Sequence, residues 1–95
     1  MVQPLIWARV VLGPRADAVY RRMNDAERAR FDRIISVIKH APEDGKFYAL
    51  APDNTRLLQM TGANMHVIYA VKYWPIGRVL LIVTIEIRDW EPREP

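Results

Sequence analysis

The side chains best suited to acid–base chemistry in this sequence are two histidines, His40 and His66. An imidazole exchanges protons readily near neutral pH, which suits His66 to proton transfer, whereas His40 suits the C-terminal end of a helix dipole. Two histidines so far apart do not form a metal-binding motif. Ser36 is the only serine and lies within a helical pattern, so no hydrolase triad is visible, and the four glycines are isolated from one another. The sequence therefore predicts neither a metal ion nor a cofactor.

The charge balance favours a polyanionic or acidic partner. Fourteen lysines and arginines outnumber eleven aspartates and glutamates, which gives a net charge of +3, and the pI is about 9.6. A basic domain attracts nucleic acid or an acidic protein. Five arginines near the middle of the N-terminal half form either an ordinary solvated surface or a contact surface for such a partner: Arg21, Arg22, Arg28, Arg30 and Arg33.

Length and composition predict one globular domain over residues 1–95, with residues 91–95 as a frayed tail. The chain has 95 residues, of which 51% are apolar and 26% charged. The absence of cysteine excludes disulfides and thiolate zinc sites, and is compatible with a reducing compartment. No signal peptide is apparent, and the longest apolar run, residues 79–85, is too short to span a bilayer. We therefore expect a cytoplasmic protein without a membrane partner.

A strand and two helices are predicted for the N-terminal part. Residues 5–12 are apolar and bulky and end at Gly13, which predicts a buried strand. Pro14 suits the first turn of a helix, and Asn24 with Glu27 predicts the capping box of a second helix that ends before Pro42. Each helix has one apolar face with i, i+3, i+4, i+7 spacing: Ala16, Val19, Tyr20 and Met23 in the first, and Phe31, Ile34, Ile35 and Ile38 in the second.

Three further strands are predicted at residues 55–60, 65–73 and 78–88, while residues 46–51 could form a short extended segment. Strands joined by short turns pair antiparallel, and two helices that precede them can cover one face of the sheet together. The expected fold is therefore α+β, in the order β-α-α-β-β-β, with an antiparallel-rich sheet and both helices on one face. The other face would be open, and its candidate residues are Arg56, Lys72, Glu86 and Arg88.

This order of elements resembles the RelE/ParE superfamily, the toxins of type II toxin–antitoxin systems. Residues 65–71 resemble the penultimate strand of that family, in which a basic residue precedes an apolar-apolar-Tyr-x-Val run. Residues 56–60 resemble the preceding strand, which typically carries an arginine. Residues 79–88 resemble the last strand, which commonly ends in a basic residue near an aromatic one. The resemblance covers roughly residues 5–90.

The resemblance implies a ribosome-dependent mRNA endoribonuclease that inhibits translation and is held inactive by a cognate antitoxin. In that branch of the family, basic residues on the open sheet face hold the mRNA backbone, and the 2′-hydroxyl attacks the neighbouring phosphate without a metal ion. Two alternatives remain: a ParE-like toxin that binds DNA gyrase, or a non-catalytic protein-interaction domain with the same fold. An antitoxin would be expected to lay an amphipathic segment across the helices or a sheet edge.

Two catalytic residues follow from the resemblance. His66 stands where the family has a basic residue, and would act as a general base or as a cation beside the scissile phosphate. Arg88 matches the basic residue that ends the last strand, and its guanidinium would stabilise the charge on a pentacoordinate phosphate. The ordinary alternatives are a hydrogen-bonded histidine on a strand, and a salt bridge of Arg88 with Asp89 or Glu86.

Four residues are expected to contact RNA on the same basis. Arg56 matches the recurrent arginine of the second strand and would contact RNA or the antitoxin, the ordinary alternative being an ion pair within the sheet. Lys72 belongs to the open face. Lys46 lies after the helices, where family members sometimes place a catalytic lysine or glutamate, and Glu43 is the nearby acid. Trp90 takes the place of a C-terminal aromatic residue, which either stacks on a base or closes the end of the core.

The C-terminal end departs from the ribonuclease pattern. The best-studied ribonuclease members close with a tyrosine or a His-Tyr pair, whereas this chain reads Arg88-Asp89-Trp90 and has no tyrosine after Tyr73. Asp89 also adds a negative charge where phosphate should bind. Both differences leave room for a gyrase-directed or attenuated member. By strand alternation Tyr69 and Tyr73 share one face, with Tyr69 expected in the core and Tyr73 exposed.

Overall fold

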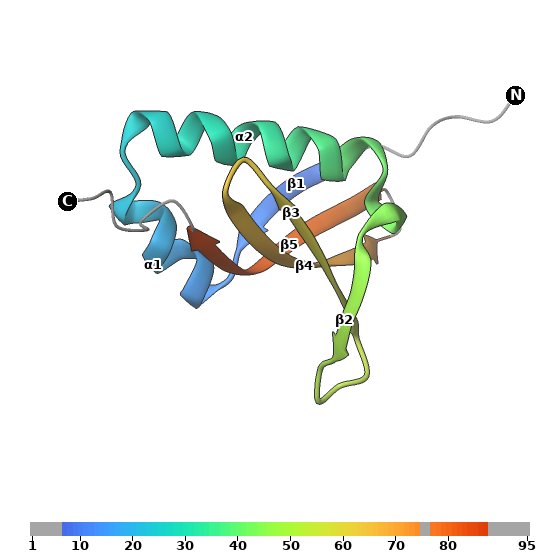
Figure 1. Ribbon diagram of the computed structural model, residues 1–95. Coiled ribbons are helices and arrows are strands. Elements are labelled where there is room, and N and C mark those ends of the chain that lie inside the picture. Colours follow the sequence, from blue (N-terminus) through green and yellow to red (C-terminus); the bar gives the residue numbers. More distant parts are fainter. Residues whose placement is uncertain (1–6, 75–76, 88–95) are drawn as a thin grey trace, which may run out of the picture.

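The computed structural model describes residues 7–74 and 77–87 of the chain (Figure 1). A strand is followed by two helices, a single turn of 3-10 helix and four strands. The elements are β1 (Trp7–Leu12), α1 (Pro14–Arg22), α2 (Asp25–His40), the 3-10 turn η1 (Pro42–Asp44), β2 (Lys46–Leu50), β3 (Arg56–Gly62), β4 (Met65–Trp74) and β5 (Gly77–Ile87).

The strands form one five-stranded sheet in the order β1-β5-β4-β3-β2. The β1 strand runs parallel to β5, and the other neighbours pair antiparallel. The β3–β4 hairpin turns through Ala63 and Asn64, both at positive φ (50° and 61°). Two successive residues with positive φ match the right-handed twist of paired strands. The turn therefore consists of these two residues alone, and β3 continues to Gly62, two residues beyond the predicted strand end at residue 60.

The α+β class and the mostly antiparallel sheet with two helices are confirmed, but the expected strand count is wrong by one. Residues 46–50 form the strand β2 at the edge of the sheet, so the order is β-α-α-β-β-β-β. Four of its five residues are exposed, and its register is interrupted between Phe47 and Ala49. A strand that pairs on one side only and buries almost nothing lacks the alternation by which strands are recognised in a sequence.

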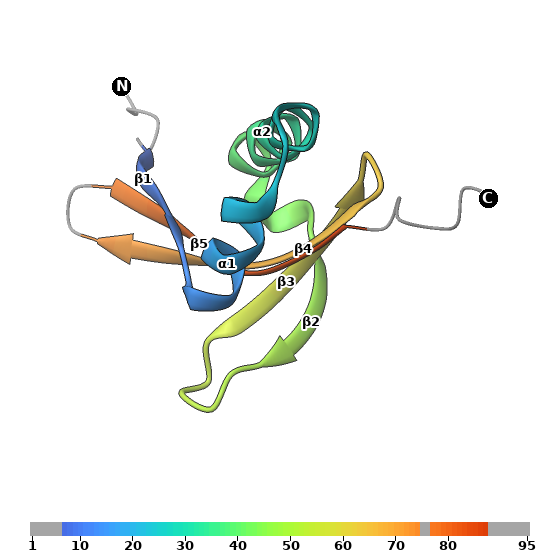
Figure 2. The same cartoon turned by 90° about the vertical axis from the view of Figure 1, so that its left-hand side faces the viewer.

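Both helices begin and pack as their sequences predict. The capping box is present, because Asn24 Oδ1 accepts from the Glu27 N–H at 2.8 Å and Glu27 Oε1 accepts from the Asn24 N–H at 2.9 Å. The buried residues of α2 are the four predicted for its apolar face, and Ala16 and Met23 of the first predicted face are buried as well. Figures 1 and 2 show α2 lying across one face of the sheet. Within the described part of the chain, no helix is long and apolar enough to cross a membrane.

The core lies between the helices and one face of the sheet. Tyr69 is fully buried there, and the predicted exposure of Tyr73, at 60%, is also confirmed. A bulge changes the β4–β5 register at Tyr69, and it lets Ile82 and Ile85 of β5 both join the core although they are three residues apart. The core face of the strands carries Leu58, Met65, Val67, Tyr69, Leu80, Ile82 and Ile85.

The opposite face of the sheet, called the open face below, carries the side chains that alternate with these core residues. Most of its centre is apolar, since Ile68 and Ala70 are also buried. Polar side chains are gathered at the end of the sheet next to the turn between β3 and β4, where Thr61 pairs with His66 and His66 pairs with Glu86. Because alternation is strict within β4, His66 lies on the open face between the buried Met65 and Val67.

Candidate functional site

His66 is held by two side chains from the neighbouring strands. Its Nε2 lies 2.7 Å from Gln59 Oε1, and its Nδ1 lies 3.6 Å from Glu86 Oε1. The Gln59 amide is oriented by a second bond, because its Nε2 donates to the Phe47 carbonyl at 3.3 Å. Gln59 therefore presents oxygen, and not nitrogen, to the imidazole.

Both ring nitrogens of His66 thus face acceptor oxygens. Gln59 Oε1 is within hydrogen-bond distance of Nε2, whereas the 3.6 Å between Nδ1 and Glu86 Oε1 is the distance of an ion-pair contact and too long for a hydrogen bond. The side chain of His66 is only 12% exposed, whereas that of Glu86 is 59% exposed. The ring is therefore fixed in place, and the carboxylate beside it remains accessible to solvent. This arrangement suits a proton donor or a cation better than a free base.

Lys46 brings a positive charge to the same end of the sheet. It lies directly opposite Gln59 in the β2–β3 ladder, so two strand spacings, roughly 10 Å, separate its backbone from that of β4. Its side chain forms no hydrogen bond or salt bridge with any residue that the structure describes. An uncommitted ammonium on a long stem can reach an anion placed between β2 and His66.

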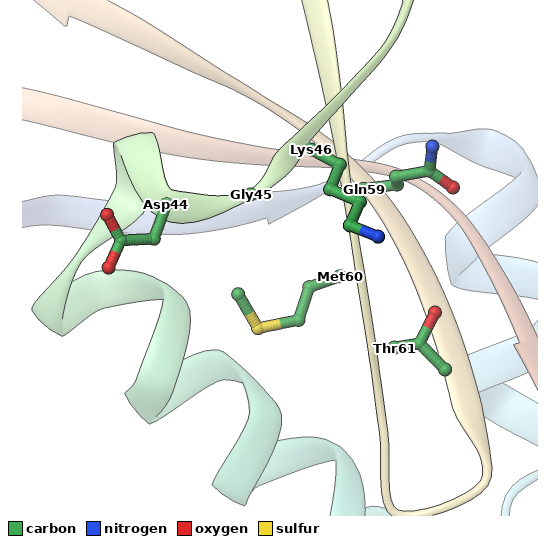
Figure 3. Close-up of a pocket in the computed structure, with 6 residues that line it drawn as sticks. All are labelled: Asp44, Gly45, Lys46, Gln59, Met60 and Thr61. Atoms are coloured by element: carbon green, nitrogen blue, oxygen red, sulfur yellow. The ribbon is translucent and has the colours of Figure 1, made fainter.

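A pocket of about 460 Å³ opens beside Lys46 (Figure 3). Figure 3 shows the Lys46 side chain extending across β3, while the Asp44 carboxylate points away from the other pocket residues. The nearest negative charge on the 3-10 turn is therefore directed out of the pocket. The lining residues are Asp44, Gly45, Lys46, Gln59, Met60 and Thr61.

Two other expected RNA contacts lie away from this end. Lys72 is on the open face, six positions beyond His66 on β4, or about 20 Å along the strand, and it donates to Thr55 Oγ1 at 2.9 Å. Arg56 is not on the open face as expected. Arg56 is two residues from the buried Leu58 on β3, so it lies on the same, core face of the sheet. Its guanidinium stacks 4.7 Å from the centre of the Phe47 ring.

The remaining sequence-based candidates divide into two groups. Glu43 accepts a hydrogen bond from Tyr73 at 3.0 Å, so it belongs to the core face and not to the His66 cluster. Burial, followed by this bond to Glu43, raises the pKa of Tyr73 above its ordinary value. Arg88 and Trp90 lie outside the described residues.

Sequence reasoning missed Gln59 and Tyr48, which both contact His66. The Tyr48 ring lies edge-to-face with the imidazole, with 6.4 Å between ring centres. Gln59 lies on the open face by alternation along β3, but its contact depends on the β3–β4 register. Tyr48 is the unpaired residue at the interruption of the β2–β3 ladder, and the sequence carries no signal for this interruption.

Tyr69 fixes the loop that leads into Lys46. Its hydroxyl donates to the Pro42 carbonyl at 2.7 Å, and this bond ties the 3-10 turn to the centre of β4. Burial raises the pKa of Tyr69 above 10.0, the carboxylates of Glu43 and Asp44 raise it further, and a hydrogen bond with the Gly45 backbone opposes them. The start of β2 is therefore positioned by a buried, uncharged phenol.

Tyr69→Phe is expected to make the protein less sensitive to alkali. Because the folded pKa lies above the unfolded value, the folded state holds a proton that the unfolded state releases above about pH 10. The stability contributed by Tyr69 is therefore complete below that pH and is lost as pH rises toward the folded pKa. Urea unfolding from pH 7 to 11 would show a shallower decline for the variant. An identical decline in both proteins would contradict this assignment.

Comparisons with known proteins found no matching family model, no matching curated protein and no matching solved structure. Among the described residues, no group of three or more histidines, aspartates or glutamates is placed to hold a metal ion.

Proposed function

We propose that this chain is the toxin of a type II toxin–antitoxin system, and that it cleaves mRNA at the ribosome as a metal-independent endoribonuclease in the cytoplasm. The observation that carries the proposal is the position of His66. The imidazole is held by Gln59 and Glu86 on the sheet face that the helices leave open, and Lys46, whose ammonium pairs with no described residue, lies at the same end of the sheet. The RelE/ParE resemblance of residues 5–90 supplies the toxin class.

The reaction needs two proton transfers and stabilisation of a dianionic phosphorane. The 2′-oxygen bonds to phosphorus and loses its proton to solvent, while the bond from phosphorus to the 5′-oxygen breaks and the leaving oxygen gains a proton. The donor pattern around His66 suits protonation of the leaving oxygen. Lys46 would balance the charge on the non-bridging oxygens.

Glu86 would act in this scheme through His66. The carboxylate lies on the Nδ1 side of the ring, so in the doubly protonated ring it would attract the Nδ1 hydrogen and leave the Nε2 hydrogen to be donated to the leaving oxygen. Gln59 occupies the position that the leaving oxygen would take beside Nε2. Substrate must therefore displace the Gln59 oxygen from His66. The Gln59 side chain can move away only if its amide turns and breaks the hydrogen bond to the Phe47 carbonyl.

A second candidate function is supported by a groove on the other side of the sheet. The space between α2 and β1 is lined by five apolar or aromatic side chains, Val10, Leu12, Tyr20, Phe31 and Ile35, and by three polar ones, Asp32, Ser36 and Lys39. Such a groove suits an amphipathic protein segment. It would receive the antitoxin under the first proposal, whereas a gyrase-directed toxin or a non-catalytic interaction domain would use it as its main binding surface.

Inducing this chain alone in bacteria is expected to arrest growth by stopping translation. Amino-acid incorporation should fall before DNA synthesis does, and mapping of 5′ ends should reveal new cuts within ribosome-bound mRNA. Intact polysome-bound mRNA during growth arrest would contradict the ribonuclease proposal. Loss of plasmid supercoiling with intact mRNA would instead support the gyrase alternative.

A further inference from the structure

A bulge in β2 turns Tyr48 toward His66. Phe47 pairs with Leu58 and Ala49 pairs with Leu57, so Tyr48 is the extra residue between two consecutive partners on β3. Bulges of this kind redirect a side chain and often occur near functional sites. Here the Tyr48 ring meets the imidazole at 65° with 6.4 Å between ring centres, whereas its neighbour Phe47 stacks with Arg56.

The Tyr48 ring keeps a large accessible surface in this position. The residue is 48% exposed, so the edge-to-face contact with His66 leaves much of its aromatic surface open to solvent. An exposed aromatic ring beside a largely buried imidazole gains little for folding stability. It does provide a flat, apolar surface next to the groups that would handle a phosphate.

Three chemical features therefore meet around the bulge. Tyr48 offers an aromatic face, Lys46 offers an ammonium two residues away, and Gln59 offers an amide on the adjacent strand. Single-stranded nucleic acid is bound by this combination, in which bases stack on aromatic rings and cations follow the backbone. Bases in a duplex are already stacked on one another, so an unpaired strand is the form that can use Tyr48.

We infer that Tyr48 stacks on a nucleobase of single-stranded RNA next to the phosphate that His66 and Lys46 contact. This inference rests on the proposed function, because that function places the phosphate at His66. It adds the residue that positions an unpaired nucleotide beside that phosphate. Tyr48 is a positioning residue, since its ring holds the base and takes no part in proton transfer.

The test is binding of a short 2′-O-methyl RNA, which the enzyme cannot cleave, followed by fluorescence anisotropy. Tyr48→Leu keeps an apolar side chain without an aromatic face, and is expected to raise Kd roughly 5- to 150-fold. Tyr48→Phe and Tyr48→Trp should bind as the parent does. Tyr73→Leu is the matched control, because Tyr73 is exposed on the core side and bonded to Glu43.

An abasic nucleotide placed along the oligonucleotide separates stacking from indirect effects. At the position that meets Tyr48, it should weaken binding to the parent and leave binding to Tyr48→Leu unchanged. Equal Kd values for the parent and for Tyr48→Leu, or no binding of the RNA to the parent, would overturn the inference. If the Tyr48 dependence holds while ribosome-bound mRNA remains intact in cells, stacking stands and the ribonuclease proposal fails.

Discussion

His66→Ala should lower the rate of RNA cleavage by about 10²- to 10⁴-fold, the contribution typical of one general acid or base. Combined with Arg88→Ala, it should relieve growth arrest completely while the domain stays folded. The ring is only 12% exposed and has two polar contacts, yet it contributes nothing to the main core. Removing it should therefore cost only about 1 kcal/mol of folding stability. Pre-steady-state cleavage on programmed ribosomes would measure the rate.

His40→Ala is the matched control for this variant. It removes the other histidine, which is exposed at the C-terminal end of α2 and outside the His66 cluster. Cleavage and growth arrest should both be unaffected. Glu86→Gln should give a smaller loss of rate than His66→Ala, because Glu86 acts only through the ring. Full toxicity of the His66→Ala, Arg88→Ala protein would place the active site elsewhere.

Local signals in the sequence predicted those elements whose stability is local. The Asn24–Glu27 capping box and the apolar face of α2 depend only on residues three or four positions apart. The different exposures of Tyr69 and Tyr73 required, in addition, that one end of β4 lie under the helices. The capping box and the apolar face could be predicted because each is set by spacing within a single element, whereas the tyrosines also depended on the order of the elements.

The edge of the sheet could not be predicted in the same way. The hairpin of β2 and β3 extends beyond the helix layer, so large apolar side chains such as Phe47 and Leu50 remain exposed (Figure 1). Exposure removes the alternation that identifies a strand. The expectation that Arg56 lies on the open face was wrong for a related reason. The face on which Arg56 lies follows from its pairing with Leu50 and not from its charge.

The candidate site shows the same difference between residues that the sequence identifies and residues that only strand pairing brings together. His66 and Lys46 were named because the family resemblance singles out their positions, and the structure places both at one end of the open face. Gln59 and Tyr48 join them only through the register of three strands and a bulge. Register is a long-range property, since it depends on which residues of distant segments face each other.

Gly45→Ala should be the most destabilising single-methyl change described here. A Cβ at this position would lie 2.9 Å from Tyr69 Cζ and 3.1 Å from the Gln59 carbonyl oxygen, and would overlap the Tyr69 hydroxyl. Tyr69 cannot move aside easily, because it is fully buried and bonded to Pro42. Overpacking of this kind costs about 1–3 kcal/mol, and a lost hydrogen bond adds about 1 kcal/mol. The free energy of unfolding in urea measures the loss.

Gly62→Ala is the control that isolates the steric cause. Gly62 lies in β3, and a Cβ there would meet only Ile34 Cγ1 at 4.0 Å, which is an ordinary van der Waals contact. Its φ is not positive, so alanine fits its backbone and should be neutral or stabilising by up to about 1 kcal/mol. A loss for Gly62→Ala as large as for Gly45→Ala would mean that the close approach to Tyr69 is not the cause of the effect.

A double-mutant cycle with Tyr69→Phe tests the contact itself. Removing the phenol oxygen eliminates the worst overlap with the new methyl group but leaves the ring carbon in place. Gly45→Ala should therefore cost less in the Tyr69→Phe background than in the parent, although more than nothing. Additive losses would mean that the methyl group displaces the 3-10 turn and not the tyrosine. In that case Lys46 moves with the turn, and Gly45→Ala should also reduce RNA binding in the Tyr69→Phe background.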